Sequence, residues 1–190
     1  MEMRVGIKGV DAAIRELERK QKRVTPILRG TLNSTATKTR TERFVKPLSR
    51  YLAAKNTRSA IRHRRADRRE LVARLVPSGK SVPVANYKQW GFENAGHPTR
   101  ARIWVMGPKG RKTAAGFVNP ASKHQLPLAT WFTRQKKGQA TRHSRKSLQP
   151  APGLSVAYWF KGLMTISTLV WAQRFMQKEL MRRIEKELDK

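Results

Sequence analysis

The chain has 190 residues, 42 Lys and Arg against 12 Asp and Glu, a net charge of +30, and no Cys. This length suits one domain and is long enough to bury a core without disulfides or metals to hold it together. The absence of Cys excludes a disulfide framework, a Cys-based zinc site and a thiol nucleophile, and the charge predicts attraction to polyanions.

The positive charge is concentrated in the middle of the sequence. Residues 1–19 and 179–190 each carry as many acidic as basic side chains, so the whole excess lies between them. Balanced amphipathic ends suit packing against protein, whereas a basic middle suits nucleic acid or an acidic protein surface. The start of the chain has no apolar signal segment, and 154–173 is too polar for a membrane span and is predicted to be a buried helix.

Two helices are predicted in the basic N-terminal part, residues 1–69. The first begins at a capping Asp11, and the second begins at Thr25-Pro26 and ends before Pro47. The second helix is rich in Thr, a weak helix former, so we expect it to need tertiary support. Residues 48–69 are strongly basic and poor in apolar side chains. They predict an exposed helix, capped by Asn56, or an extended arm.

The segment 70–133 has the pattern of a small antiparallel sheet. Runs of apolar and β-branched residues between turn signals predict strands at 71–76, 82–90, 102–106, 116–118 and 126–133. Pro83 places the second of these strands at a sheet edge, because proline cannot donate a ladder hydrogen bond.

The rest of the chain is predicted to be a long basic loop, 134–153, followed by one long helix, 154–190. The fold class is therefore α+β in a single domain: two N-terminal helices, a small sheet with long basic loops, and a C-terminal helix. One apolar stripe on that helix is predicted to contact the core or another protein; it comprises Trp159, Ile166, Leu169, Met176, Leu180 and Ile184.

Catalysis has little support in the sequence. The four His are scattered, no known catalytic motif is present, and few acids lie away from the termini. The proximity of Glu93 and His97 is typical of a loop hydrogen bond, and 107–110 of a hairpin turn. We therefore expect no enzyme activity, no metal and no cofactor.

The basic segments predict contact with a nucleic acid backbone without base readout, because Lys and Arg displace counterions from phosphates. An acidic protein surface is the alternative partner. The candidate residues are Arg58, Arg62, Arg64, Arg65, Arg68, Arg69, Lys109, Arg111, Lys112, Lys136, Lys137, Arg142, Arg145 and Lys146.

The order of these elements resembles that of a known family. Gly6-Ile7-Lys8-Gly9-Val10 precedes the first helix, Pro26 and Asn33 lie in the second, and a basic helical run at 58–69 leads into the strand at 71–76. A Pro-rich edge, basic hairpins, Gly116-Phe117-Val118 and a final helix at 175–186 follow. This order is similar to that of the minor tail protein Z family of lambda-like tailed phages, and of small tail-completion proteins more widely.

The resemblance implies a structural virion protein and not an enzyme. Proteins of this group act at the head-proximal end of the tail and usually form rings with the six-fold symmetry of the tail. The expected neighbours are copies of the chain, tail terminator, tail tube or neck proteins, and genome DNA in the lumen, with assembly in the host cytoplasm and no membrane. The alternative is a non-specific nucleic-acid-binding protein of the ribosomal or nucleoid type.

Overall fold

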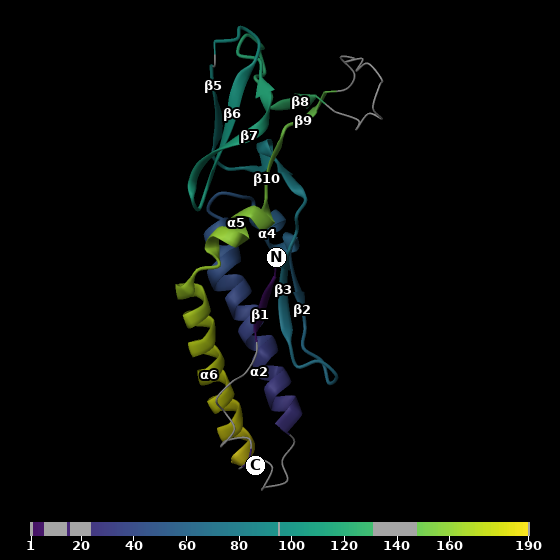
Figure 1. Cartoon of the computed structure of the whole chain (residues 1–190), viewed down its shortest axis with the longest axis vertical. Coiled ribbons are helices and arrows are strands. Elements are labelled where there is room, and N and C mark those ends of the chain that lie inside the picture. The colour runs from purple at the N-terminus through teal and green to yellow at the C-terminus, as the bar shows by residue number, and fades with distance from the viewer. Residues whose placement is uncertain (1, 6–14, 16–23, 95, 131–147, 190) are drawn as a thin grey trace.

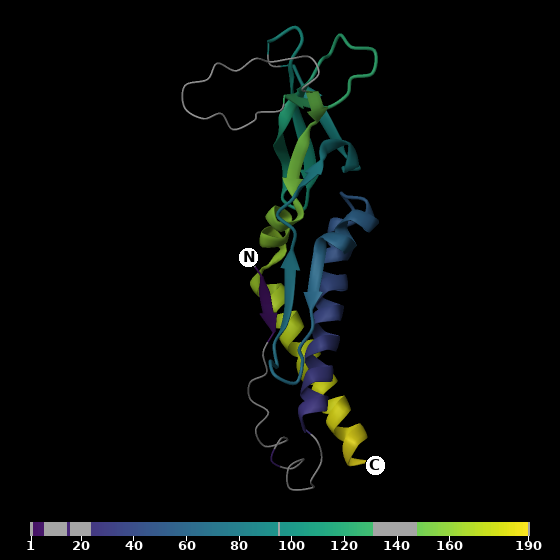
Figure 2. The same ribbon diagram turned by 90° about the vertical axis from the view of Figure 1, so that its right-hand side faces the viewer.

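Helix α6, helix α2 and a three-stranded sheet are layered side by side in one part of the elongated molecule, and a five-stranded sheet lies beyond them at one end (Figures 1 and 2). The computed structural model describes residues 2–5, 15, 24–94, 96–130 and 148–189. Helices and antiparallel sheets are both present, so the α+β prediction is confirmed. The first predicted helix lies outside the described residues, apart from Arg15.

All strand pairs are antiparallel, in the orders β1-β3-β2, β10-β4 and β5-β6-β7-β8-β9. The elements in chain order are β1 (Met3–Val5), α2 (Val24–Thr39), the π-helical η1 (Arg40–Val45), α3 (Lys46–Leu48), α4 (Ala54–Ala60), β2 (Ile61–Arg64), β3 (Ala73–Pro77), β4 (Ser81–Pro83), the 3-10 turn η2 (Val84–Asn86), β5 (Trp90–Glu93), β6 (Ala101–Gly107), β7 (Gly110–Val118), β8 (Leu128–Thr130), β9 (Leu148–Pro150), β10 (Pro152–Ser155), α5 (Val156–Leu163) and α6 (Ile166–Leu188).

The second predicted helix does not end before Pro47. It continues from α2 through η1 into α3, with Pro47 in the first turn of α3. The π-helical turns of η1 explain this continuation. The backbone N–H of Lys46 donates to the carbonyl of Thr41, five residues back, instead of to the residue four back. Pro47 has no N–H, so it needs no hydrogen-bond acceptor in the preceding turn. The threonine-rich α2 has the tertiary support that its composition requires, because it packs between α6 and β3.

The segment 48–69 is more deeply embedded than its composition predicts. Leu52 and Ile61 are fully buried and β2 pairs with β3, so the segment is not an exposed helix or an extended arm throughout, although its arginines are exposed as expected. Asn56 does not cap the short helix α4: it lies within the helix, and the N-cap position is held by Ala53, which makes no side-chain cap. Side chains alternate between the two faces of a strand, so one apolar residue, Ile61, anchors β2 while its arginines stay in water.

Most predicted strands are present with shifted ends. Strands β3, β6, β7 and β8 overlap the predictions at 71–76, 102–106, 116–118 and 126–133, of which 131–133 lie outside the described residues. The strand predicted at 82–90 is interrupted by η2, and its first part, β4, pairs only with β10, as Pro83 at an edge requires. The loop predicted to reach residue 153 is wrong over 148–153, where β9 and the start of β10 form, and 134–147 are outside the described residues.

The C-terminal helix is also divided, because β10 extends to Ser155 and the helical part consists of α5 and α6. Thr165 begins α6 by accepting a hydrogen bond from the backbone N–H of Thr168, and the hydroxyl of Thr168 donates to the carbonyl of Leu163 at 2.9 Å. These threonines satisfy backbone groups that the break would otherwise leave without partners.

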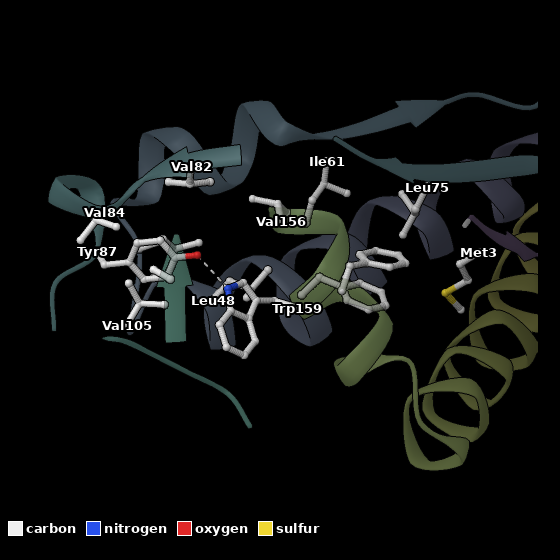
Figure 3. Packing of buried hydrophobic residues seen from close by; sticks show 14 of the residues in the cluster. Met3, Leu48, Ile61, Leu75, Val82, Val84, Tyr87, Val105, Val156 and Trp159 are labelled. Carbon is white, nitrogen blue, oxygen red and sulfur yellow. Dashed lines mark hydrogen bonds between the residues drawn. The ribbon is translucent and has the colours of Figure 1, made fainter. Parts of the chain in front are cut away.

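The larger of two buried apolar clusters connects the sheets to the helices, and α5 is at its centre (Figure 3). The indole N–H of Trp159 donates to the hydroxyl of Tyr87 at 3.0 Å, and this hydroxyl donates to the carbonyl of Leu154 at 2.7 Å. The next residue, Phe160, stacks on Phe44 of η1 with ring centroids 4.0 Å apart. Burial also raises the pKa of Tyr87, so it stays a neutral hydrogen-bond donor.

The α2–α6 pair is joined by a charged cluster whose strength depends on pH. Glu179 accepts hydrogen bonds from Arg182 at 2.8 and 2.9 Å and from Arg183 at 2.8 Å, and Arg183 reaches Ser34 of α2 at 2.9 Å. The Arg182 hydrogen bond is the main cause that lowers the pKa of Glu179 to about 2.

We expect Glu179→Gln to lower the free energy of unfolding at neutral pH by about 1–2 kcal/mol, less than the pKa alone implies because both arginines are partly in water. The folded pKa lies below the unfolded one, so this stabilisation is present above pH 4.5 and is lost as the pH falls toward 2. Urea unfolding across this pH range measures it. Glu185→Gln, at an exposed position of the same helix, is the control, and an equal effect of both variants would contradict the prediction.

Candidate nucleic-acid interface

The outer face of strands β2 and β3 carries a row of arginines. Arg62 and Arg64 are exposed, whereas Ile61 of the same strand is buried. In the register of the sheet Arg64 is directly opposite Arg74 of β3, and Arg62 is opposite Val76. Arg4 of β1 is the register partner of Arg74 on its other side. The strand order β1-β3-β2 therefore aligns three arginine positions across the sheet.

Helix α2 holds this pair of strands in place through Asn33. The Asn33 side-chain amide donates to the carbonyl of Ala66 at 3.1 Å, and its oxygen accepts from the N–H of Ala66 at 2.8 Å. The Asn33 amide thus bonds both backbone groups of Ala66, as a neighbouring strand would, at a position just beyond the end of β2. These bonds position the basic segment that follows against the body of the protein.

His63 faces inward from β2, and its Nδ1 lies 3.4 Å from the hydroxyl of Thr37 on α2. Burial, and then the charges of Arg65 and Arg40, lower the pKa of His63. It is therefore neutral at pH 7 and adds no charge to the arginines around it.

Two acidic residues beside the arginines of β2 and β3, Asp67 and Glu70, are already engaged. Asp67 accepts hydrogen bonds from the backbone N–H groups of Arg69 and Glu70 at 2.8 and 2.7 Å, and these bonds are the main cause that lowers its pKa. Glu70 forms an ion pair with Arg74. The turn is thus held by Asp67, while Arg68 and Arg69 remain exposed.

The structure divides the predicted basic residues into separate groups. Six of them lie on α4, on β2 or in the segment that follows it: Arg58, Arg62, Arg64, Arg65, Arg68 and Arg69. Lys109, Arg111 and Lys112 are in the β6–β7 hairpin, which approaches α5 and not β2 (Figure 1). The other five, Lys136, Lys137, Arg142, Arg145 and Lys146, are outside the described residues.

The hairpin group has fewer free cations than its sequence implies. Arg111 forms an ion pair with Glu93, and its guanidinium carbon is 4.4 Å from the ring centroid of Trp104. The methylene chain of Lys109 lies so close to Gly162 of α5 that a Cβ there would overlap it. The segment around β2 is therefore the stronger candidate interface.

Sequence reasoning missed Arg74 and Arg40. Arg74 lies within a correctly predicted strand, and its alternation with the buried Ala73 and Leu75 was a signal that it faces outward. Arg40 donates to the carbonyl of Arg58 and so joins η1 to α4, a contact that no local pattern reveals.

The predicted protein-contact residues also divide into two sets. Trp159, Met176, Leu180 and Ile184 are buried in the chain's own core, whereas Ile166 is 80% exposed and Leu169 47% exposed. Within the described ranges there is no group of three or more His, Asp and Glu able to hold a metal ion, and no helix there has the length and apolarity that crossing a membrane requires.

Comparison of the chain with protein-family models, with curated proteins and with solved structures found no match.

Proposed function

We propose that this chain is a structural virion protein that completes the head-proximal end of a phage tail, as a ring with its basic surface toward DNA or an acidic neighbour. The observation that carries the proposal is the separation of two kinds of surface. Exposed arginines lie on the outer face of β2–β3, while an apolar patch of exposed side chains, Ile166, Leu169 and Val170, lies at the start of α6. A ring protein needs both, one surface toward its copies and one toward the charged partner.

A second copy of this chain is the proposed occupant of this apolar patch. Copies that each carry +30 repel one another, so they must meet where charge is lowest. Lys161 is the only charged residue between 148 and 173, and Arg43 of η1 reaches this stretch by donating to the hydroxyl of Ser167 at 3.2 Å. Ile166, Leu169 and Val170 are exposed in this stretch and supply the apolar area that a subunit contact buries.

The proposal predicts closed rings of the purified chain in about 0.5 M NaCl, where the repulsion between copies is screened. Sedimentation velocity and negative-stain electron microscopy would detect them. We expect the double variant Ile166→Glu/Leu169→Glu to sediment as a monomer, because it places charge in the contact. Gln173→Glu/Gln177→Glu makes the same charge change at exposed positions of α6 and should still form rings.

A wild-type chain that remains monomeric under these conditions would contradict the proposal. This result would instead favour the alternative, a non-specific nucleic-acid-binding protein of the ribosomal or nucleoid type. Rings that persist in the Ile166→Glu/Leu169→Glu variant would place the subunit contact elsewhere.

A further inference from the structure

The outer face of β2–β3 lacks the features of a protein-binding surface. Protein interfaces are centred on buried apolar or aromatic anchors surrounded by a polar rim. In the described part of the chain, the large apolar side chains that are exposed all come after residue 125. The face of β2–β3 offers the exposed Arg62 and Arg64. Beside them on β3 lie the half-buried Val76 and Arg74, whose side chain is 24% exposed and paired with Glu70.

We propose that this face binds the phosphate backbone of double-stranded DNA without reading its sequence. The proposal rests on the proposed function and specifies which polyanion the basic surface meets. A guanidinium presents paired N–H donors that match the oxygens of a phosphate, and these contacts need no apolar anchor. Arg62 and Arg64 are two residues apart on one side of a strand, so both can reach the same duplex.

The arrangement is unfavourable for the isolated protein, which supports a binding role. Like charges directly opposite each other on neighbouring strands destabilise a sheet, and Arg64 is opposite Arg74. Glu70 neutralises one of these charges through its ion pair with Arg74. Asp67 is occupied by the turn, so Arg62 and Arg64 have no carboxylate partner among the described contacts. Phosphates would offset their repulsion.

A second explanation for these arginines is protection of an exposed strand edge. β2 is the edge strand of its sheet, and charged residues on edge strands prevent pairing with other chains. This explanation predicts that removing the arginines causes aggregation and leaves DNA affinity unchanged. The two roles can therefore be separated by measurement.

The test compares two double variants of the full chain that remove the same charge. Arg62→Gln/Arg64→Gln alters the proposed face, and Arg174→Gln/Lys178→Gln alters exposed positions on α6, on the other side of α2 from the sheet (Figures 1 and 2). Fluorescence anisotropy with a labelled duplex of arbitrary sequence, measured from about 50 to 200 mM NaCl, gives the affinity and its salt slope. Thermal unfolding and light scattering check that both variants are folded and dispersed.

For the wild type we expect affinity to fall by about 10³-fold or more over this range if at least six phosphates are contacted. Arg62→Gln/Arg64→Gln should reduce the slope of log K against log [salt] by about 2, one for each lost phosphate contact, whereas the α6 variant should keep the wild-type slope. Equal slopes in the two variants would overturn the proposal, because binding would then follow net charge and not this face. Aggregation of the Arg62→Gln/Arg64→Gln variant with unchanged DNA affinity would also overturn it, in favour of edge protection.

Polyglutamate serves as the probe for an acidic protein partner. If the wild type binds polyglutamate as tightly as DNA, and Arg62→Gln/Arg64→Gln weakens both equally, an acidic protein would be the better assignment and the proposal is overturned. Ring formation of the variant in high salt is an independent measurement. If the Arg62→Gln/Arg64→Gln variant forms rings and binds DNA as tightly as the wild type, this inference is wrong and the proposed function stands. If the wild type is monomeric but binds DNA through Arg62 and Arg64, the proposed function is wrong and this inference stands.

Discussion

Replacing Leu180 by Asp is expected to abolish cooperative folding. Leu180 is 1% exposed and packs with Ile27 and Ile184, where the first turns of α2 meet the last turns of α6. The substitution removes a buried apolar side chain and leaves a carboxylate without a partner in its place, at a cost of about 5 kcal/mol. Single domains are stable by only about 5–15 kcal/mol, so a loss of this size unfolds many of them.

Urea unfolding followed by circular dichroism tests this expectation, with Met181→Asp as the matched control. Met181 is the next residue along α6 and is 50% exposed, so its carboxylate would remain in water. We expect the control to unfold within about 1 kcal/mol of the wild type. Wild-type stability in Leu180→Asp would show that α6 does not pack on α2 in solution.

Replacing Trp159 by Ala is expected to lower the free energy of unfolding by about 4 kcal/mol, the usual cost of truncating a large buried aromatic side chain. Trp159 is 1% exposed and links α5 to Gly107 of β6, in the five-stranded sheet, and to Tyr87, just before β5. A Cβ on Gly107 would overlap the indole ring, so the ring lies directly against the backbone of β6. The cavity that Trp159→Ala leaves lies between the helices and the sheet, so both should become less stable.

Hydrogen exchange measured together with urea unfolding tests whether the link is lost, and Tyr158→Ala is the control. Tyr158 is adjacent in sequence but 45% exposed, so its removal leaves no enclosed cavity. We expect faster amide exchange in β6 and β7 of the Trp159→Ala variant only. Unchanged exchange there would mean that the sheet is stable without its contact to α5.

Local patterns were sufficient to predict the elements whose own residues determine them. The alternation of buried and exposed residues along β6 is visible in the sequence because a half-buried strand must alternate. The spacing of Met176, Leu180 and Ile184 identified the buried stripe of α6 for the equivalent reason in a helix. The charge of the region around β2 is also a property of the sequence alone.

Contacts between distant segments determined the rest, and no local pattern carries them. β9 forms because 148–150 meets β8, although its sequence has the composition of a loop. The helix predicted at 154–190 breaks after α5, because Trp159 and Phe160 pack toward Tyr87 and Phe44, in parts of the chain far away in sequence.

The same distinction applies to the candidate interface. Sequence determined that arginines are plentiful at 58–69, but not that Arg64 would lie opposite Arg74 or that Glu70 and Asp67 would be engaged nearby. Strand register decides which charges are neighbours, and register is set by which side chains must enter the core. Here Ile61 and Leu75 enter the core. Their neighbours Arg62 and Arg74 therefore point to the opposite, outer face of the sheet.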